Sequence, residues 1–519
     1  MSLKISAENL AAYDNYHLPE DNKKTLVIVR QYDEERDKLA VEELEGQCDF
    51  GQRGQPSLFT DLMGDPISRI RNLPLHVMLV AEYGEDREIV GIIRGCIKTV
   101  TRGNKGSIPC PVYVKVAYIL GLRVSSHHRR LGIGTKLVEK LEEWSRNNGA
   151  KYAYMATDSN NQASIKLFTS KCNYEKFRTP SVLVQPVHAH YKPIASDIAI
   201  VRVSPQLSES FYRRIFTNSE FFPKDINHIL DNKLNFGTFM AVPKKTLLKW
   251  DPKSGSFPPT FAILSIWNTK DVYKLQVRGV SSLKYACCLG TRALDSWMPW
   301  LRVPSIPNIF KTFGFYLLYG IHMEGKEGPR LMKSICNFAH NMGRNDRDCR
   351  LLVSEVGLDD PVREAIPRWN KFSWGDLWCM KKLDVSESPD NWVESRASSS
   401  SVIFVDPRNI PVIYTQYTRM YITGKWNSGP ARKPSSGADL GAHCRIVHNS
   451  IGINSTTRIN SRRHQWRTWA ASFIQSAWRR HMRRKIAELR HNEEMEEDGF
   501  KENDDGETEL TPMLHKAPE

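Results

Sequence analysis

The sequence predicts a mixed α/β (α+β) fold, a three-layer sandwich in which helices cover a mixed central sheet. Apolar β-rich runs alternate with amphipathic helical patterns between residues 25 and 185, and a glycine-containing turn joins one strand to a helix. The same order of elements returns between residues 198 and 384. With 519 residues, 40% apolar and 25% charged, the chain can bury the cores of about three ordinary domains.

Periodicity and local stop signals define the elements of the first segment. Residues 1–24 are polar and are expected to form a flexible tail. Acidic residues open the helical pattern at 33–44, as expected near the positive end of a helix dipole. The sequence YGED at 83–86 separates two β-rich runs and indicates a hairpin. The predicted order is a strand at 25–30, a helix at 33–44, loop and helix at 57–71, strands at 76–82, 88–100 and from 118, a helix ending near 149, a strand at 151–157, a helix at 160–171 and a strand from 175.

The turn RRLGIG, at residues 129–134, is typical of a pyrophosphate site. Gly132 and Gly134 have no Cβ, so the backbone can approach an anion closely. The first N–H groups of the following helix and its positive dipole end add attraction for negative charge. Arg129 and Arg130 contribute full charges beside the turn.

The strand, the loop and the elements after them resemble the GNAT superfamily of acyl-CoA-dependent N-acetyltransferases. The family's phosphate loop, Q/R-x-x-G-x-G/A, matches at Arg129, Gly132 and Gly134. Its second signature matches at Asn161 and has Phe168 where tyrosine is usual. The segments SLFTDLMGDPISRIRN, VGIIRGCIKTV, NNQASIKLFTSKCNY and IFVDPR further resemble plant hookless-type N-acetyltransferases over about residues 25–408. In that group, phenylalanine is expected at position 168.

The resemblance implies that acetyl-CoA is the co-substrate and that no metal ion takes part. It implies that the strand leading into the loop contacts the pantetheine arm, while the loop holds the pyrophosphate. The expected acetyl-CoA contacts are Leu122, Arg123, Val124, Arg129, Arg130, Leu131, Gly132, Ile133, Gly134, Thr135, Asn161 and Phe168.

Acetyl transfer to an amine requires a neutral nitrogen, although a lysine amine has a reference pKa of about 10.4. A group or a water chain must take a proton, and a donor should assist the departing thiolate. Many GNAT enzymes use the second-signature tyrosine as that donor, but Phe168 has no hydroxyl. Tyr174 and Tyr118 are candidate donors and Glu82 is a candidate base, although packing of the two tyrosines and solvation of the glutamate are the favoured explanations.

The segment 198–384 is expected to be a second, degenerate GNAT-like domain. Gly325, Gly328 and Arg330 stand where the first segment has its phosphate loop, and Asp360 stands where it has Asn161. The second loop lacks the arginine pair, and Pro329 removes one N–H from it. Phosphate binding is therefore not expected there.

Residues 396–464 are polar, begin with a serine run and are predicted to be a low-complexity linker. A basic amphipathic helix is predicted at 465–490, before an acidic, disordered tail at 491–519. The helix resembles the calmodulin-binding tail of plant cyclic-nucleotide-gated channels and the IQ motif, and packing onto the body is its structural alternative. No channel domain accompanies it, so a gene fusion and a gene-prediction error are both open. The expected calmodulin contacts are Trp469, Phe473, Ile474, Gln475, Trp478, Arg479 and Arg484.

Composition excludes several classes of function. No stretch approaches the roughly 18 consecutive apolar residues of a membrane helix, and the N-terminus has no secretory signal. Ten scattered cysteines without a CxxC pair fit neither a zinc site nor a disulfide framework. The net charge of +15 is partly concentrated near the C-terminus, so direct nucleic-acid binding is not supported.

Two functions follow from these features. The first is an acetyl-CoA-dependent N-acetyltransferase acting on an amine, such as a protein or histone lysine, with calmodulin binding by the tail. The alternative is a non-catalytic acyl-CoA-binding or scaffold protein regulated by calmodulin. The hookless resemblance implies a nuclear location, with the cytoplasm as the alternative.

Overall fold

The computed structural model describes residues 27–47, 57–103, 111–251, 256–301, 305–370, 372–384, 392–393 and 402–409. The predicted tails at 1–24 and 491–519 and the helix at 465–490, with all its expected calmodulin contacts, lie outside these residues. The chain divides into two compact units, one formed by 1–292 and 305–427 and the other by 293–304 and 428–519. The second unit is described only at 293–301, where α8 (Ser282–Trp297) ends and the 3-10 helix Pro299–Leu301 follows. The predicted α/β segments therefore belong to the first unit, apart from residues 293–304 of the second segment.

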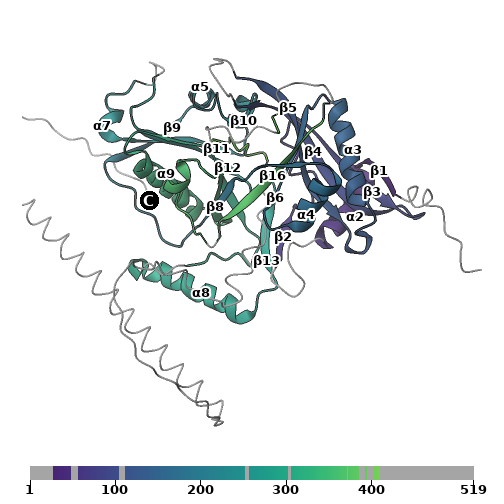
Figure 1. The fold of residues 1–519 in the computed structure, drawn as a ribbon. Helices are drawn as coiled ribbons and strands as arrows, with labels where there is room; N and C mark the ends of the chain where they lie inside the picture. Colours follow the sequence, from purple (N-terminus) through teal and green to yellow (C-terminus); the bar gives the residue numbers. More distant parts are fainter. Residues whose placement is uncertain are drawn as a thin grey trace, which may run out of the picture. The chain divides into compact units, whose positions relative to one another are not determined.

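The first segment is a sheet with helices on both faces (Figure 1). Its hydrogen-bonded order is β1-β3-β4-β5-β6, antiparallel except for the parallel pair β5 and β6. Because side chains alternate along a strand, Ile93 and Ile97 pack beneath α3, whereas Ile92 and Cys96 pack beneath α2. The elements are β1 (Val27–Gln31), α2 (Glu34–Gln47), β2 (Ser57–Asp61), β3 (Leu75–Tyr83), β4 (Glu88–Arg102), β5 (Tyr113–Val124), α3 (Ile133–Asn147), β6 (Tyr152–Asp158), α4 (Gln162–Lys166), a π-helical turn (Leu167–Lys171), β7 (Glu175–Arg178) and β8 (Ser181–Pro186).

The beginning of the predicted loop and helix at 57–71 is a strand instead. Ser57–Asp61 forms β2 and pairs antiparallel with β13 (Lys274–Arg278), from Ser57 opposite Arg278 to Asp61 opposite Lys274. The partner strand lies far along the chain, so no local pattern reveals the pairing. Turns follow β2 up to β3.

The second segment repeats the order of the first. Its strands pair as β9-β11-β12-β14-β15, again with one parallel pair, β14 and β15. Helix α9 packs on β11, β12, β14 and β15, as α3 packs on the first sheet. The elements are β9 (Ile198–Val203), α5 (Pro205–Ile215), β10 (Glu220–Pro223), α6 (Ile226–Leu230), β11 (Asn235–Pro243), α7 (Lys244–Leu247), β12 (Phe261–Asn268), β13, α8, β14 (Gly314–Glu324), α9 (Gly328–Asn345), β15 (Cys349–Val356), α10 (Val362–Ala365) and β16 (Trp374–Lys382).

The two segments exchange their last strands. β8 from the first segment pairs antiparallel with β15 of the second, and β16 from the second pairs antiparallel with β6 and β7 of the first. Fourteen of the described strands thereby join into one sheet, while β2 and β13 form a separate two-stranded sheet. An exchanged strand satisfies backbone groups that its own segment cannot pair, so neither half completes its sheet alone.

A strap at residues 402–409 crosses this unit after β16. It lies within the stretch predicted as a linker, yet Phe404 and Asp406 are buried, 2% and 1% exposed. Phe404 N–H donates to the Glu220 carbonyl at 2.9 Å, which ties the strap to β10. None of the helices in the described part of the chain has the length and apolar character needed to cross a membrane.

Candidate functional site

The predicted phosphate loop forms an exposed turn between β5 and α3. Gly132 has φ +79°, and an added Cβ would meet no heavy atom within 4 Å. Conformation, not space, therefore requires glycine at this position. No side chain among the described residues caps α3 at Gly132, so the first N–H groups of this helix face outward. These features fit a pyrophosphate group.

The neighbouring residues support the same geometry. Arg129, Arg130 and Leu131 are exposed, Ile133 is buried in the core, and Thr135 is half-buried. An added Cβ on Gly134 would meet Leu167 Cδ2 at 3.4 Å, an ordinary contact. Packing alone therefore does not explain glycine at position 134, whereas close approach of an anion would.

β5, the strand that leads into the loop, stops pairing with its neighbour β6 before β5 itself ends. The parallel pairing of β5 and β6 ends at Ile119 opposite Met155, and beyond this point β5 continues as far as Val124. Leu122, Arg123 and Val124, the predicted pantetheine contacts, all lie on this separated stretch. Gly121, with φ +64°, forms a bulge against β4 that leaves room for the buried Arg94 side chain. The strand therefore presents unpaired backbone on the side facing β6.

Asn161 and Phe168 have structural roles on the α3 side of the sheet. The Asn161 side chain accepts a hydrogen bond from Ser164 N–H at 3.2 Å and so caps α4. Phe168 is 1% exposed and packs edge-on against Tyr174, with ring centroids 5.2 Å apart. Burial, with the Glu142 carboxylate nearby, raises the pKa of Tyr174 far above its ordinary range, which makes its hydroxyl a poor proton donor.

Glu82 lies at the opposite edge of the first sheet. Its carboxylate accepts a hydrogen bond from Arg30 Nε at 2.7 Å and also pairs with Arg36. Two guanidinium groups thus hold the anion in place on β3. Neither Glu82 nor Tyr174 lines the pocket described next.

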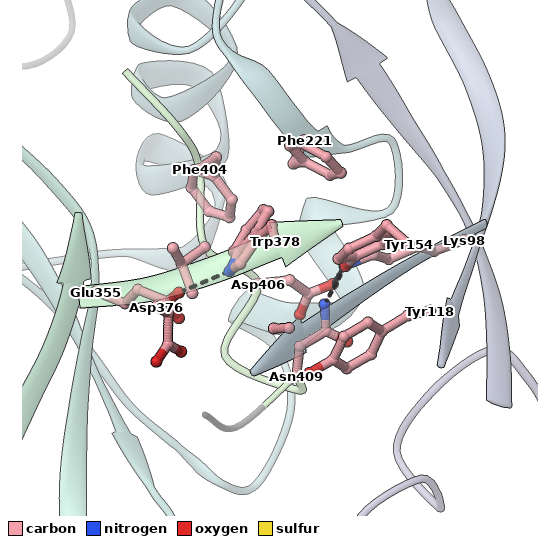
Figure 2. A pocket seen from close by; sticks show the side chains of 12 residues that line it. Lys98, Tyr118, Tyr154, Phe221, Glu355, Asp376, Trp378, Phe404, Asp406 and Asn409 are labelled. Atoms are coloured by element: carbon pink, nitrogen blue, oxygen red, sulfur yellow. Dashed lines mark hydrogen bonds and ion pairs between the residues drawn. The ribbon is translucent and has the colours of Figure 1, made fainter. Parts of the chain in front are cut away.

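A pocket of about 440 Å³, including its open mouth, lies where the two halves meet (Figure 2). Tyr118, the remaining catalytic candidate, lines it from β5, beside the point where β5 and β6 separate. Its ring stacks on Tyr154 with centroids 4.8 Å apart. The other lining residues come from β4, β6, β10, β15, β16 and the strap: Lys98, Ala156, Phe221, Glu355, Asp376, Trp378, Phe404, Val405, Asp406 and Asn409.

The strap closes one side of the pocket with an ion-paired carboxylate. Asp406 accepts hydrogen bonds from Arg408 Nη2 at 2.8 Å and lies 3.7 Å from Lys98 Nζ. Burial alone would raise the pKa of Asp406, but Arg408 and Lys98 lower it to about 2. Asn409 Nδ2 donates to the Tyr154 hydroxyl at 2.9 Å. This side of the pocket is therefore electrostatically compensated.

The other side holds two carboxyl groups, and neither has a cationic partner in the part of the chain that the structure describes. Trp378 Nε1 donates to Glu355 Oε1 at 3.0 Å, and Trp374 Nε1 donates to Asp376 Oδ1 at 2.7 Å. Burial raises the pKa of Glu355 to about 7. Burial and the negative charge of Glu355 also raise the pKa of Asp376. A buried pair of this kind resists double ionisation and can exchange a proton near neutral pH.

Sequence reasoning missed these pocket residues. Glu355 lies within the apolar run CRLLVSEV, and Asp376 directly precedes the apolar run LWCMKKL, so neither is marked as a site residue by a local motif. A carboxylate inside or at the end of an apolar strand was the available signal, because burying it is costly. Their proximity depends on the exchange of β16 and could not be seen locally.

The second loop differs from the first. Arg330 pairs with Asp197 at 2.6 Å and with Glu327 at 3.0 Å. An added Cβ on Gly325 would lie 2.6 Å from the Thr260 side chain, so packing explains this glycine. Asp360 accepts a hydrogen bond from Val362 N–H at 3.0 Å, next to α10. Among the described residues, no three His, Cys, Asp or Glu side chains gather to hold a metal ion.

Comparison with known proteins places these features in a family. The profile of the acetyltransferase (GNAT) family matches residues 40–174. "Probable N-acetyltransferase HLS1" of Arabidopsis thaliana is 47% identical over 405 residues, which cover 74% of this chain and 100% of that protein. "Putative cyclic nucleotide-gated ion channel 7" of the same plant is 51% identical over 71 residues in the C-terminal segment, 14% of this chain and 9% of the channel. A GCN5-related N-acetyltransferase structure from Sphaerobacter thermophilus aligns with a TM-score of 0.39 at 13% identity, over 69% of this chain and 96% of that one. The chain therefore belongs to the acetyltransferase (GNAT) family, and acetyl-CoA is its acyl donor.

Proposed function

We propose that this N-acetyltransferase binds acetyl-CoA at the Arg129–Thr135 loop and acetylates an amine held in the pocket between the two halves. The observation that carries the proposal is the separated end of β5. Tyr118 lines the pocket just before this separation, and Gly132 opens α3 just after β5 ends. A donor lying along this strand would have its pyrophosphate at the loop and its reactive end near the pocket.

Different residues of the chain would bind different parts of acetyl-CoA. Acetyl-CoA supplies the acetyl group as a thioester. The uncapped N–H groups of α3, with Arg129 and Arg130, would hold the pyrophosphate. Leu122, Arg123 and Val124 would hold the pantetheine arm along β5. Asn161 would hold the start of α4 in place. Phe168 would support the pantetheine-binding region from the α3 side of the sheet.

Measuring acetyl-CoA binding by calorimetry tests the loop. Gly132→Asp and Arg129→Glu should each weaken binding by about tenfold or more, because each sets a carboxylate against the pyrophosphate. Lys140→Glu is the matched control, since it makes the same charge change as Arg129→Glu farther along α3. Unchanged affinity in both loop variants would refute the assignment.

The acceptor is proposed to be a protein lysine, with histone lysines as one class. A peptide library screened with labelled acetyl-CoA would identify it. The absence of a hydroxyl at Phe168 favours the alternative of a non-catalytic acyl-CoA-binding scaffold. Such a protein would bind acetyl-CoA and give no turnover on any amine.

The C-terminal segment is proposed to bind calmodulin, supported by its similarity to the channel. Titrating a peptide of residues 462–490 with calmodulin, with and without calcium, tests this; absence of a tight complex would refute it. A nuclear location is also proposed, from the resemblance to the hookless group. Imaging a fluorescent fusion would check it, and an exclusively cytoplasmic signal would count against it.

A further inference from the structure

We infer that Glu355 is the catalytic base of the proposed acetyl transfer, and that Asp376 is the neutral carboxyl group beside it. The inference rests on the proposed function, because it takes the pocket as the place where the amine binds. It assigns the base to the second half of the chain, whereas the donor loop belongs to the first half.

The geometry distinguishes Glu355 from the other pocket carboxylates. Asp406 is held by Arg408 and Lys98. Among the described residues, neither Glu355 nor Asp376 forms an ion pair within 4 Å. Both receive hydrogen bonds from tryptophan Nε1 groups, which orient a carboxyl without neutralising it. Figure 2 shows the two carboxyl groups next to each other on the same side of the pocket.

The order of the strands places Glu355 and Asp376 near β5, the strand proposed to bind acetyl-CoA. Glu355 lies on β15, and Asp376 on the exchanged strand β16. In β16, Asp376 stands opposite Asp158 and Trp378 opposite Ala156, so the pair lies beside the end of β6. β6 is the strand from which β5 separates. A base at this position reaches an amine that approaches the open side of β5.

The electrostatic surroundings suit proton uptake from an ammonium group. Burial raises the pKa of Glu355 to about 7, whereas Lys98 and the hydrogen bond from Trp378 act in the opposite direction. Asp158 and Glu355 both raise the pKa of Asp376 after the larger effect of burial. Besides Glu355, the titratable groups that line this pocket and the adjoining hollow on β15 are Lys98, Tyr118, Tyr154, Tyr319, Asp360, Asp376 and Asp406.

The pocket walls indicate the shape of the acceptor. The rings of Tyr154, Phe221 and Trp378 pack around the pocket, with Tyr154 and Trp378 centroids 5.5 Å apart. Aromatic faces attract an ammonium group and offer apolar contact to an alkyl chain. A primary amine on an unbranched alkyl chain, as in lysine, fits these walls.

The reaction balances with Glu355 as the first proton acceptor. One proton passes from the substrate ammonium to the Glu355 carboxylate, and the neutral amine attacks the thioester carbonyl carbon. The C–N bond forms and the C–S bond breaks. The second nitrogen proton goes to the leaving sulfur, and Glu355 releases its proton to solvent. The products are an amide and a free thiol.

The test compares the full-length chain with Glu355→Gln and Asp376→Asn, using acetyl-CoA and a short peptide with a single lysine. Wild-type kcat/KM should rise about tenfold per pH unit below pH 7 and then flatten. Glu355→Gln should lose about 100-fold at pH 7 and lose this inflection, while its acetyl-CoA affinity stays unchanged. Asp376→Asn should leave the inflection in place, because burial and the charge of Glu355 keep Asp376 protonated where Glu355 ionises.

The control is Glu88→Gln, an exposed carboxylate on β4, which should keep the wild-type profile. A Glu355→Gln profile equal to the wild-type profile would overturn the inference. A chain that binds acetyl-CoA but acetylates neither the peptide nor n-butylamine would overturn it as well, and would leave the binding loop standing. Loss of acetyl-CoA binding in Gly132→Asp, with Glu355 unaltered, reports on the loop alone.

Discussion

Glu355→Gln should make the fold more stable at alkaline pH, even though it removes a proposed catalytic group. Glu355 is 6% exposed, and its pKa is raised from the ordinary 4.5 to about 7. A carboxyl whose pKa is raised in the folded state favours folding while it is protonated, and this advantage is lost as pH rises through the folded pKa. Gln keeps an oxygen that can accept the Trp378 hydrogen bond and never ionises.

The magnitude follows from the pKa difference. The ionised carboxylate costs about 3 kcal/mol at pH 8.5 and about 1 kcal/mol at pH 5.5. The stability gained by the substitution should therefore increase by about 2 kcal/mol across this range. Any pH-independent effect of the amide on packing cancels in this difference. Asp376 changes this stability difference in the same direction. The negative charge of Glu355 raises the pKa of Asp376, so removing that charge also lowers the cost of ionising Asp376.

Urea denaturation of wild type and variant at pH 5.5, 7.0 and 8.5 measures this difference. Glu88→Gln controls for the loss of one surface carboxylate. A Glu355→Gln stability difference that is independent of pH would refute the reasoning, since Glu355 would then not carry a raised pKa in the folded protein. A difference that decreases as pH rises would refute it more strongly.

Three further substitutions test the surroundings of the site. Gly121→Val should cost about 2–4 kcal/mol in urea denaturation, because φ is +64° and a Cβ would lie 2.8 Å from Arg94 Nη1; a cost under about 0.5 kcal/mol would contradict this. Asp406→Asn should cost about 3–5 kcal/mol at pH 7, since it leaves Lys98 buried without its carboxylate. Because the folded pKa of Asp406 is lowered to about 2, this difference should shrink as pH falls from about 4 towards 2, and denaturation curves at about pH 2.5, pH 4 and pH 7 check the trend. Phe168→Tyr should lower the melting temperature without raising turnover, because position 168 is 1% exposed in an apolar core; increased acetyl transfer would mean that the hydroxyl reaches the thioester.

The local geometry of the predicted phosphate loop could be predicted from the sequence, because its signals are local. Gly132 with φ +79° opens α3 directly after the β5 strand, as the RRLGIG turn indicates. A strand, a glycine turn and an amphipathic helix each depend on residues within a few positions of one another. The predicted roles of these residues toward acetyl-CoA remain predictions that the loop substitutions test.

The acceptor side was not predictable, because its geometry depends on contacts between distant segments. Local periodicity predicted a strand at β16 but could not show that this strand pairs with β6. It also predicted loop and helix at 57–71, because β13, the strand that pairs with Ser57–Asp61, lies far along the chain. The strap lies in a stretch of linker-like composition and is held by Asp406, Arg408 and Phe404 through buried contacts. The pair of Glu355 and Asp376 exists only after the strands have exchanged.

The sequence by itself determined the alternation of strands and helices, the phosphate-type loop and its recurrence in weakened form. Hydrophobic periodicity, glycine conformation and helix dipoles depend on residues a few positions apart, so they can be predicted directly from the amino-acid sequence. The tertiary structure decided which strands pair, where the pocket lies and which carboxyl groups have a raised pKa. Strand pairing satisfies backbone groups regardless of their separation along the chain, and burial shifts a pKa only once distant residues have excluded water.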